Sequence, residues 1–577
     1  MTAIPVGERP ERESVLRRVP YFGLLVGVIV LGMAALVVYP IVRMIYDVFG
    51  TDRFGDQQVS SVFSDPELWP AVLNTVVLIV AGGLGALLIG TILAWLNERT
   101  DARLNWAADV LPIIPLLIPS IAVAVGWVFL FAPRAGLVNV LLRWAFHSHA
   151  TGLAASGPIN IYTLTGIVIV TIIITVPYPY LIMSAALQNV DPALEEASRM
   201  SGRGPVATFF RVTLPAVRNA IATASSILVL IIMAMFAAPI VIGLQGGIDV
   251  LSTHIFNVVY AVSPPRLAEG IVLSTLMLVA AQLTVLVEYL VTRSGHHATI
   301  GGRSHTRSLT RLGALRIPAR ILILGYVAVT TVAPFIALLL VSFQGFWTAQ
   351  VDWSKLSLVN YRQLFNQGSA FAAGLTNSVI LAVAAATILM VVSALIAFFV
   401  HNAPGRLGGI VNGIATLPSS IPQTVVAIGF LITLGVGALQ GSLLLLLLAY
   451  LVLFLPMASR AAGSAMSQIG KDLWESSSMS GASPLRTFRK ILLPLMLAGL
   501  LSGWVIVFAH TLGETNAGVF LSGASNPVVG PQILASWQIN GNYSALGALT
   551  VCITIIQVAV VAVTMIVSRR RFSYRGI

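Results

Sequence analysis

Few residues in this chain are of types that could do chemistry inside an apolar protein. His510 and Glu514 lie four residues apart in an apolar stretch, so both would fall on one face of a helix. Ionisable residues in such a stretch usually face an internal cavity or a partner. The pair could therefore line a path through the protein, or it could lock two helices together. His147 and His149 could contact a metal, although histidines in a solvated loop are the simpler interpretation.

The patterns of nucleotide-binding and catalytic sites are missing from the sequence. No stretch fits Gly-x4-Gly-Lys-Ser/Thr, the loop that holds nucleotide phosphates. Nucleophile triads, paired catalytic carboxylates and zinc-ligand spacings are also missing, and the only cysteine, Cys552, has no partner for a disulfide. We therefore expect a protein that is not an enzyme and that holds no cofactor or metal of its own.

Composition predicts that most of the chain lies in lipid. Of its 577 residues, 57% are hydrophobic and 9% charged, and the mean hydropathy is +0.92. Long apolar runs are typical of membrane helices rather than of barrel strands, so the predicted fold is an all-α polytopic membrane protein. The net charge of +12 is spread through short loops, which argues against a nucleic-acid partner.

Apolar runs between charges and turn residues predict twelve membrane spans. These lie near residues 21–42, 71–96, 107–131, 161–187, 219–243, 269–292, 321–343, 371–400, 409–435, 442–459, 499–521 and 544–567. With both termini in the cytoplasm, 26 of the 33 Lys and Arg residues fall on the cytoplasmic side. This asymmetry predicts that orientation.

The sequence repeats, which predicts two six-span units. Asn74-Thr75 matches Asn377-Ser378, and Pro115-Leu-Leu-Ile-Pro119 matches Pro418-Ser-Ser-Ile-Pro422, each 303 positions on. We expect a first unit at 1–292, a basic cytoplasmic linker at 293–320 and a second unit at 321–577. An even number of spans makes the two units parallel.

A second pair of repeats lies in two predicted cytoplasmic loops. Residues 191–215 and 470–494 share 11 of 25 positions. Each loop reads as a short helix, a turn at Gly202 or Gly481, and a second helix that begins at a proline three residues later. We expect the two glycines to be left-handed, and Pro215 and Pro494 to end the second helix before the next span.

These loops resemble the signature of permeases in binding-protein-dependent ABC importers of the type I fold: Glu-Ala-Ala, three residues, Gly, nine residues, then Ile-x-Leu-Pro. The alanines have become Ala197-Ser198 and Ser476-Ser477. In that family the hairpin couples the permease to its ATPase. The resemblance implies that role for Glu196, Ala197, Gly202, Pro215, Glu475, Gly481 and Pro494.

The same resemblance implies partners and a location. It implies two copies of a separate ATPase subunit that binds ATP and Mg²⁺, an extracytoplasmic solute-binding protein, and a place in the bacterial inner membrane. Transport would proceed by alternating access. The fused units, and the segments 239–243 and 250–256, are similar to ferric iron permeases. Ferric iron is therefore the favoured solute, with thiamine, polyamines and phosphonates as alternatives.

We expect an asymmetric translocation path. His510, Glu514 and Asn516 would supply its polar contacts, with Met235 and Pro239 as an apolar wall from the first unit. A proton-coupled secondary transporter of the major facilitator type also has twelve spans, and His510 with Glu514 could relay its protons. The paired hairpins have no use in that class. A membrane-embedded enzyme is the third alternative, and it lacks a catalytic constellation.

Overall fold

The computed structural model describes residues 20–49, 62–104, 114–116, 118–146, 156–293, 309–366, 368–402 and 406–573. Within these ranges the named elements are all helices, as predicted. In the first half they are α1 (Pro20–Phe49), α3 (Leu68–Val77), η2 (Leu78–Gly82), α4 (Gly83–Arg99), α5 (Ser120–Phe131), α6 (Leu137–Ala145), α7 (Leu164–Thr175), α8 (Pro177–Gln188), α9 (Pro192–Met200), α10 (Pro205–Thr208), η5 (Phe209–Thr213), α11 (Leu214–Ala216), α12 (Arg218–Met233), η6 (Pro239–Gly243), α13 (Leu244–Gly246), α14 (Leu251–Phe256), η7 (Asn257–Ala261) and α15 (Leu267–Arg293).

The second half repeats this order. Its elements are η8 (Gly313–Leu315), α16 (Arg316–Val327), η9 (Ala328–Val332), α17 (Ala333–Phe343), η10 (Trp353–Lys355), α18 (Val359–Leu364), α19 (Ala370–Asn402), α20 (Arg406–Thr416), η11 (Leu417–Ser420), α21 (Gln423–Thr433), η12 (Gly437–Leu439), α22 (Leu443–Ser467), α23 (Lys471–Met479), α24 (Pro484–Thr487), η13 (Phe488–Leu492), α25 (Leu493–Leu512), α26 (Asn516–Leu521), α27 (Val529–Ala535), η14 (Ser536–Asn540) and α28 (Tyr543–Ser573). Helix α16 begins inside the segment that we predicted to be the linker.

Long apolar helices dominate the described part of the chain. Eight are long and apolar enough to cross a membrane, and the number rises to 12 if four sharply bent helix pairs are each counted as one span. The bends have a local cause. The predicted ninth span is two helices, α20 with η11 and then α21, at 97° to each other, and Pro422 lies at the break. Proline lacks an N–H and disfavours helix in the residue before it.

Besides the ninth, four predicted spans are not continuous helices: the third, fourth, fifth and eleventh. The fourth consists of α7 and α8, which are bent by 41°. In the described part of the predicted third span, the α-helical part begins only after Pro119, as the short helix α5. The predicted fifth and eleventh spans run too far, because α12 ends at Met233 and α25 ends at Leu512. In both units the chain then breaks and continues into shorter helices. Apolar composition continues through these breaks, so hydropathy alone could not locate them.

The repeated pair Asn74-Thr75 holds a short helix of the first unit in place. The Asn74 side-chain amide donates to the Asp249 carbonyl at 2.8 Å, and the Leu251 backbone N–H donates to the Thr75 hydroxyl at 2.8 Å. Two side chains on α3 thereby satisfy backbone groups around the start of α14. These groups would otherwise lack helical partners.

The second copy of the pair makes the same two contacts. The Asn377 amide donates to the Pro527 carbonyl at 2.9 Å, and the Val529 N–H donates to the Ser378 hydroxyl at 2.9 Å. Helix α27 is therefore the counterpart of α14, with Val529 in the place of Leu251. The repeat seen in the sequence corresponds to one structural device used twice.

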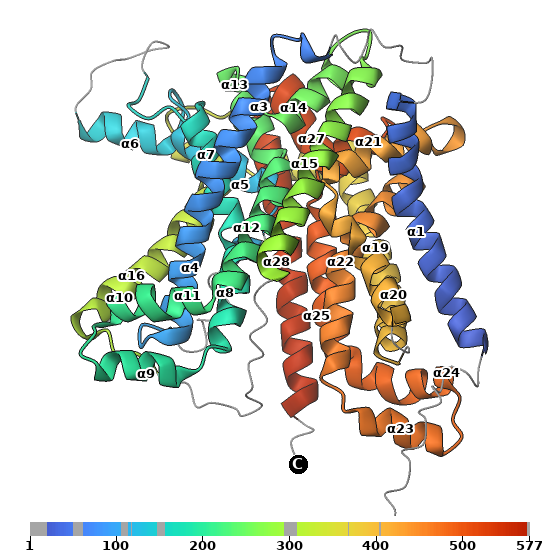
Figure 1. Cartoon of the computed structure of the whole chain (residues 1–577). Helices are drawn as coiled ribbons and strands as arrows, with labels where there is room; N and C mark the ends of the chain where they lie inside the picture. Colours follow the sequence, from blue (N-terminus) through green and yellow to red (C-terminus); the bar gives the residue numbers. More distant parts are fainter. Residues whose placement is uncertain are drawn as a thin grey trace, which may run out of the picture.

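The two units are interlocked through their first helices. Helix α1 packs against α21 and α20 of the second unit, and α17 packs against α5 of the first unit. Figure 1 shows α1 beside α19 and α20. The crossing points are matched: a Cβ on Gly126 would lie 2.7 Å from the Pro334 Cβ, and one on Gly429 would lie 3.2 Å from the Pro40 Cβ. Only glycine lets these helices approach so closely.

Candidate functional site: two hairpins and a central cavity

The first hairpin has the predicted helix–turn–helix form. The Asp191 carboxylate accepts a hydrogen bond from the Ala193 N–H at 2.9 Å and caps α9. The turn contains Gly202, whose φ is +79°. Pro205 then starts α10. The left-handed conformation that we predicted for this glycine is confirmed.

The second hairpin is built the same way. Helix α23 ends at Met479, Gly481 has φ +75°, and Pro484 starts α24. The Ser483 hydroxyl accepts a hydrogen bond from the Arg486 N–H at the start of α24. Figure 1 places α9 and α23 at one end of the molecule, the end where the C-terminus is marked. The two hairpins therefore form a pair on one side.

A buried hydroxyl pair joins the two arms of each hairpin. The Ser198 and Thr208 hydroxyls lie 3.0 Å apart, and the Ser477 and Thr487 hydroxyls lie 2.8 Å apart. The serines stand where the signature has its second alanine. The departure from the signature is thus compensated in both copies, since each buried serine finds a threonine partner.

The carboxylates of the hairpins divide into buried and exposed ones. Glu196 and Glu475, together with Ala197, are exposed. Glu195 is buried; it accepts a hydrogen bond from Thr213 at 2.7 Å and lies 3.9 Å from the buried Arg99 guanidinium. Glu195 therefore fastens the hairpin to α4, whereas Glu196 and Glu475 face outward.

Exposed apolar side chains mark both hairpins, and the sequence analysis missed them. Met200 and Met479 are each 89% exposed, and Leu194 and Leu473 are about half exposed. Both pairs are related by 279 positions, the offset of the hairpin repeat. The aligned loops already contained a signal, because large apolar residues recur at matched positions of both. The structure shows that these side chains are exposed to solvent.

The two prolines of the hairpins differ, and only Pro215 acts as predicted. Pro215 precedes a break at Val217, and the helices on either side of it are bent by 75°. Pro494 lies in the first turn of α25, and the helix runs on from Pro484 to Leu512 without a sharp bend. The prediction that Pro494 ends the second helix is wrong, since the helix continues through it, directly after the π-helical turn η13.

A cavity of about 270 Å³ lies between the two units, at the helix breaks. Of the five residues predicted to form the path, His510, Glu514, Asn516 and Met235 line it. Pro239 is not among the described lining residues and lies in η6, beyond the end of α12. The repeated proline segments supply much of the remaining wall, with Pro115, Pro119, Pro418 and Pro422 among the lining residues.

Glu514 does not share a helix face with His510, contrary to our prediction. Helix α25 ends at Leu512, and Glu514 lies in the break that follows it. Its carboxylate accepts hydrogen bonds from the Ala517 N–H at 2.8 Å and the Gly518 N–H at 3.0 Å, so it caps α26. A carboxylate at a helix N-terminus is stabilised by the unpaired N–H groups and the helix dipole.

Asn516 connects the two units across the cavity. Its side-chain amide donates to the Ala234 carbonyl of the first unit at 3.2 Å and to the Gln423 side-chain oxygen at 2.9 Å. Ala234 follows the end of α12, and Gln423 begins α21. The chain breaks after α12, before α21 and before α26 thus meet at the side-chain amide of Asn516. His147 and His149 lie outside the described residues, as does most of the predicted linker.

Comparison of the sequence with known protein families identifies the family of this chain. The family model described as "Binding-protein-dependent transport system inner membrane component" matches residues 86–293 and 391–572. The two matches together cover more than half of the chain and fall on its two structural halves. The chain belongs to this family, and it is a multi-pass inner-membrane permease of an ABC importer.

Individual relatives agree with the family. The chain is 26% identical over 532 residues to a ferric transport system permease protein FbpB of Actinobacillus pleuropneumoniae, covering 91% of this chain and 75% of that protein. It is 27% identical over 220 residues to the spermidine/putrescine permease PotC of Haemophilus influenzae, covering 38% and 85%. A bacterial alginate ABC importer superposes at TM-score 0.38 and 17% identity, covering 44% of this chain and 94% of that one.

Proposed function

We propose that this chain moves a small solute, ferric iron before any other, inward through the membrane by alternating access driven by a separate ATPase. The single observation that supports this most strongly is the pair of matched hairpins, which present Met200 and Met479 on one side of the molecule. Two equivalent projections on one side suit two copies of one partner. The cavity between the units is the proposed path.

Each hairpin would bind one ATPase subunit. An exposed methionine is flexible and fills a groove on a partner readily. The exposed Glu196 and Glu475 would add polar contacts at the rim of that interface. Because a hydroxyl pair fixes each hairpin internally, and Glu195 also fastens the first hairpin to α4, a movement of the ATPase would be passed to the membrane helices rather than absorbed in the loop.

In this proposal both termini are cytoplasmic, ATP and Mg²⁺ are bound by the ATPase, and a loaded binding protein docks on the opposite face. The end of the molecule with α9 and α23 would then be the cytoplasmic end. A reporter fused after Ile577 should be active in the cytoplasm. Activity restricted to the outside would reverse the orientation.

The ferric substrate is supported by the FbpB relatives, which match most of this chain, whereas PotC matches about a third of it. The test is uptake of ⁵⁵Fe³⁺, thiamine, spermidine and a phosphonate by a strain that lacks the gene and by the complemented strain. We expect only iron uptake to depend on the chain, and to be abolished by vanadate. If the uptake of another solute depended on the chain instead, that solute would replace ferric iron as the proposed substrate.

A further inference from the structure

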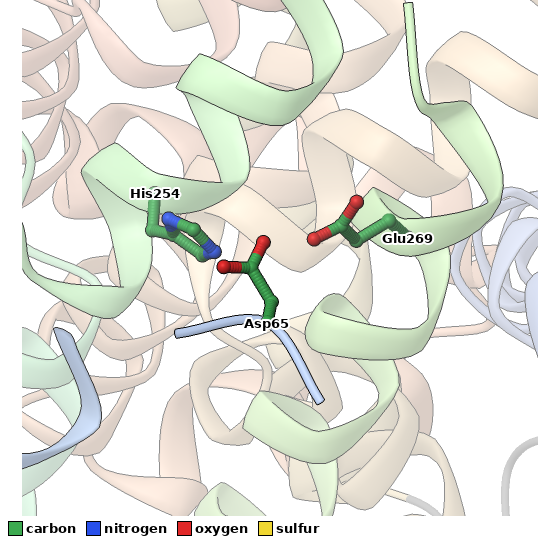
Figure 2. Close-up of side chains that lie close together, drawn as sticks. All are labelled: Asp65, His254 and Glu269. Atoms are coloured by element: carbon green, nitrogen blue, oxygen red, sulfur yellow. The ribbon is translucent and has the colours of Figure 1, made fainter. Parts of the chain in front are cut away.

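Three potential metal ligands meet away from the central cavity, on the side of the first unit opposite the hairpins. A nitrogen of His254 and carboxylate oxygens of Asp65 and Glu269 lie within 4.8 Å of one another. They come from three segments: the turn before α3, helix α14 and the first turn of α15. Figure 2 shows the Asp65 carboxylate between the His254 ring and the Glu269 carboxylate.

His254 is the unusual member of this cluster. The residue is 1% exposed, and among the described residues neither of its ring nitrogens has a hydrogen-bond partner. One oxygen of Glu269 is likewise buried without a described partner. Buried polar groups in folded proteins are nearly always satisfied, so an unpartnered imidazole and an unpartnered carboxylate oxygen on either side of Asp65 indicate a missing ligand.

The fold holds His254 in place through the contacts already described. Thr75 and Asn74 fix the start of α14, and the Thr253 hydroxyl bonds to the Asp249 carboxylate at 3.0 Å. The imidazole therefore lies on a helix whose position is set by other side chains. A site with fixed ligands needs little rearrangement when an ion binds.

Among the described residues, the second unit has no matching cluster. Since Val529 occupies the place of Leu251, the counterpart of His254 is Gln532, whose amide donates to the Ala370 carbonyl. The same helix therefore folds in the second unit without an imidazole. A structural need for histidine at this position does not explain His254.

We propose that Asp65, His254 and Glu269 form a binding site for a transition-metal ion, and that it receives the ferric ion from the binding protein before the ion enters the central path. Carboxylate oxygens and a neutral imidazole suit iron, manganese and zinc rather than soft ions. Bonds of about 2 Å place ligand atoms roughly 3 Å apart, so side chains whose ligand atoms now lie within 4.8 Å must move closer together when the ion binds. The role as a relay for cargo rests on the proposed function; the site itself does not.

Arg266 gives this site a means of release. Its guanidinium lies 3.4 Å from Glu269 and 3.7 Å from Asp65, and its side chain is about half exposed. The guanidinium competes with the metal ion for both carboxylates. Because it can swing into solvent and return, it would lower the affinity enough for the ion to leave, as a relay requires.

The test uses the purified full chain in lipid nanodiscs. The probes are ⁵⁵Fe³⁺ presented as its nitrilotriacetate complex and Mn²⁺ followed by electron paramagnetic resonance. We expect one bound ion per chain with either probe. The affinity should fall by about tenfold or more in His254→Gln and in Asp65→Asn. His254→Gln copies the residue of the second unit, so the fold should tolerate it. Glu67→Gln, an exposed neighbour on the same turn, is the matched control and should bind as the wild type.

Two results overturn the site: no binding of either probe by the wild type, or binding that both variants leave unchanged. Binding lost in the variants supports it. The uptake assay separates the two proposals. If the site binds metal while cells import another solute through this chain, the ferric function fails and the site stands. If iron uptake depends on the chain but the variants bind and transport as the wild type, the site fails alone.

Discussion

At the scale of single residues, Glu514 shows that a buried carboxylate can line a cavity while its oxygens are already engaged in hydrogen bonds. Both of its oxygens accept backbone N–H groups of α26, and Tyr450 is a further hydrogen-bond partner. Its oxygens are therefore engaged by hydrogen-bond donors rather than left open to a solute. The cap shapes the cavity wall, because α26 begins with Asn516, which bridges the two units.

Substitutions of Glu514 should distinguish its role as a helix cap from any role of its charge. Glu514→Gln keeps an oxygen that can accept an N–H, so we expect it to lower the free energy of unfolding by less than about 1 kcal/mol, and Glu514→Ala by about 1–2 kcal/mol. Thermal unfolding in detergent measures this. His510→Gln, which leaves the cap intact, is the control. Normal stability with no transport in Glu514→Gln would show that the charge itself acts on the solute.

At the scale of elements, each hairpin is a rigid unit whose turn depends on one glycine. A Cβ on Gly202 or Gly481 would meet no described atom within 4 Å, so the constraint is the backbone conformation alone. A left-handed residue costs an L-amino acid roughly 1–2 kcal/mol, and β-branched side chains resist it most, whereas asparagine tolerates it.

The glycine turns should therefore discriminate between side chains of similar size. We expect Gly202→Val and Gly481→Val to leave the chain in the membrane but to lower transport per ATP hydrolysed at least severalfold, because the hairpin no longer fits its partner. Gly202→Asn and Gly481→Asn should behave nearly as the wild type. Coupled transport and ATPase assays in proteoliposomes measure the ratio. Equal effects of valine and asparagine would contradict the backbone argument.

The exposed methionines should decide the binding of the ATPase. Burying one such side chain contributes about 1.5–3 kcal/mol, so Met200→Asp combined with Met479→Asp should weaken co-purification of the ATPase by tenfold or more. Met200→Leu with Met479→Leu keeps the apolar surface and serves as the control. Undiminished co-purification of the aspartate variant would place the interface elsewhere on the molecule.

At the scale of the whole molecule, the two units cannot move independently, since each contributes its first helix to the other. The matched contacts Gly126 with Pro334 and Gly429 with Pro40 lie where those helices cross. Asn516 adds a polar connection at the cavity. In the proposed alternating-access cycle, opening the path to one side would therefore tilt each unit together with the first helix of the other.

Enlarging Gly126 should loosen this interlock. A Cβ there would lie 2.8 Å from the Pro334 carbonyl oxygen, a backbone atom that cannot rotate away. We expect Gly126→Val to cost about 1–3 kcal/mol and to lower the amount of folded chain in the membrane. Gly413→Ala, on an exposed position of α20 with nothing within 4 Å, should be neutral or slightly stabilising. Fluorescence-detected size-exclusion chromatography on heating compares the two.

The sequence by itself determined whatever is local or periodic. Apolar runs gave the helical membrane class, and the repeat gave two units with paired hairpins, down to the left-handed Gly202 and Gly481. These follow from hydropathy and from backbone sterics, which act within a few residues. Tertiary structure decided the rest. Hydropathy does not change where α12 and α25 break, so only the tertiary structure shows that Glu514 caps a helix. Likewise, only the fold brings together Asp65, His254 and Glu269, which are spread over about 200 residues of the sequence.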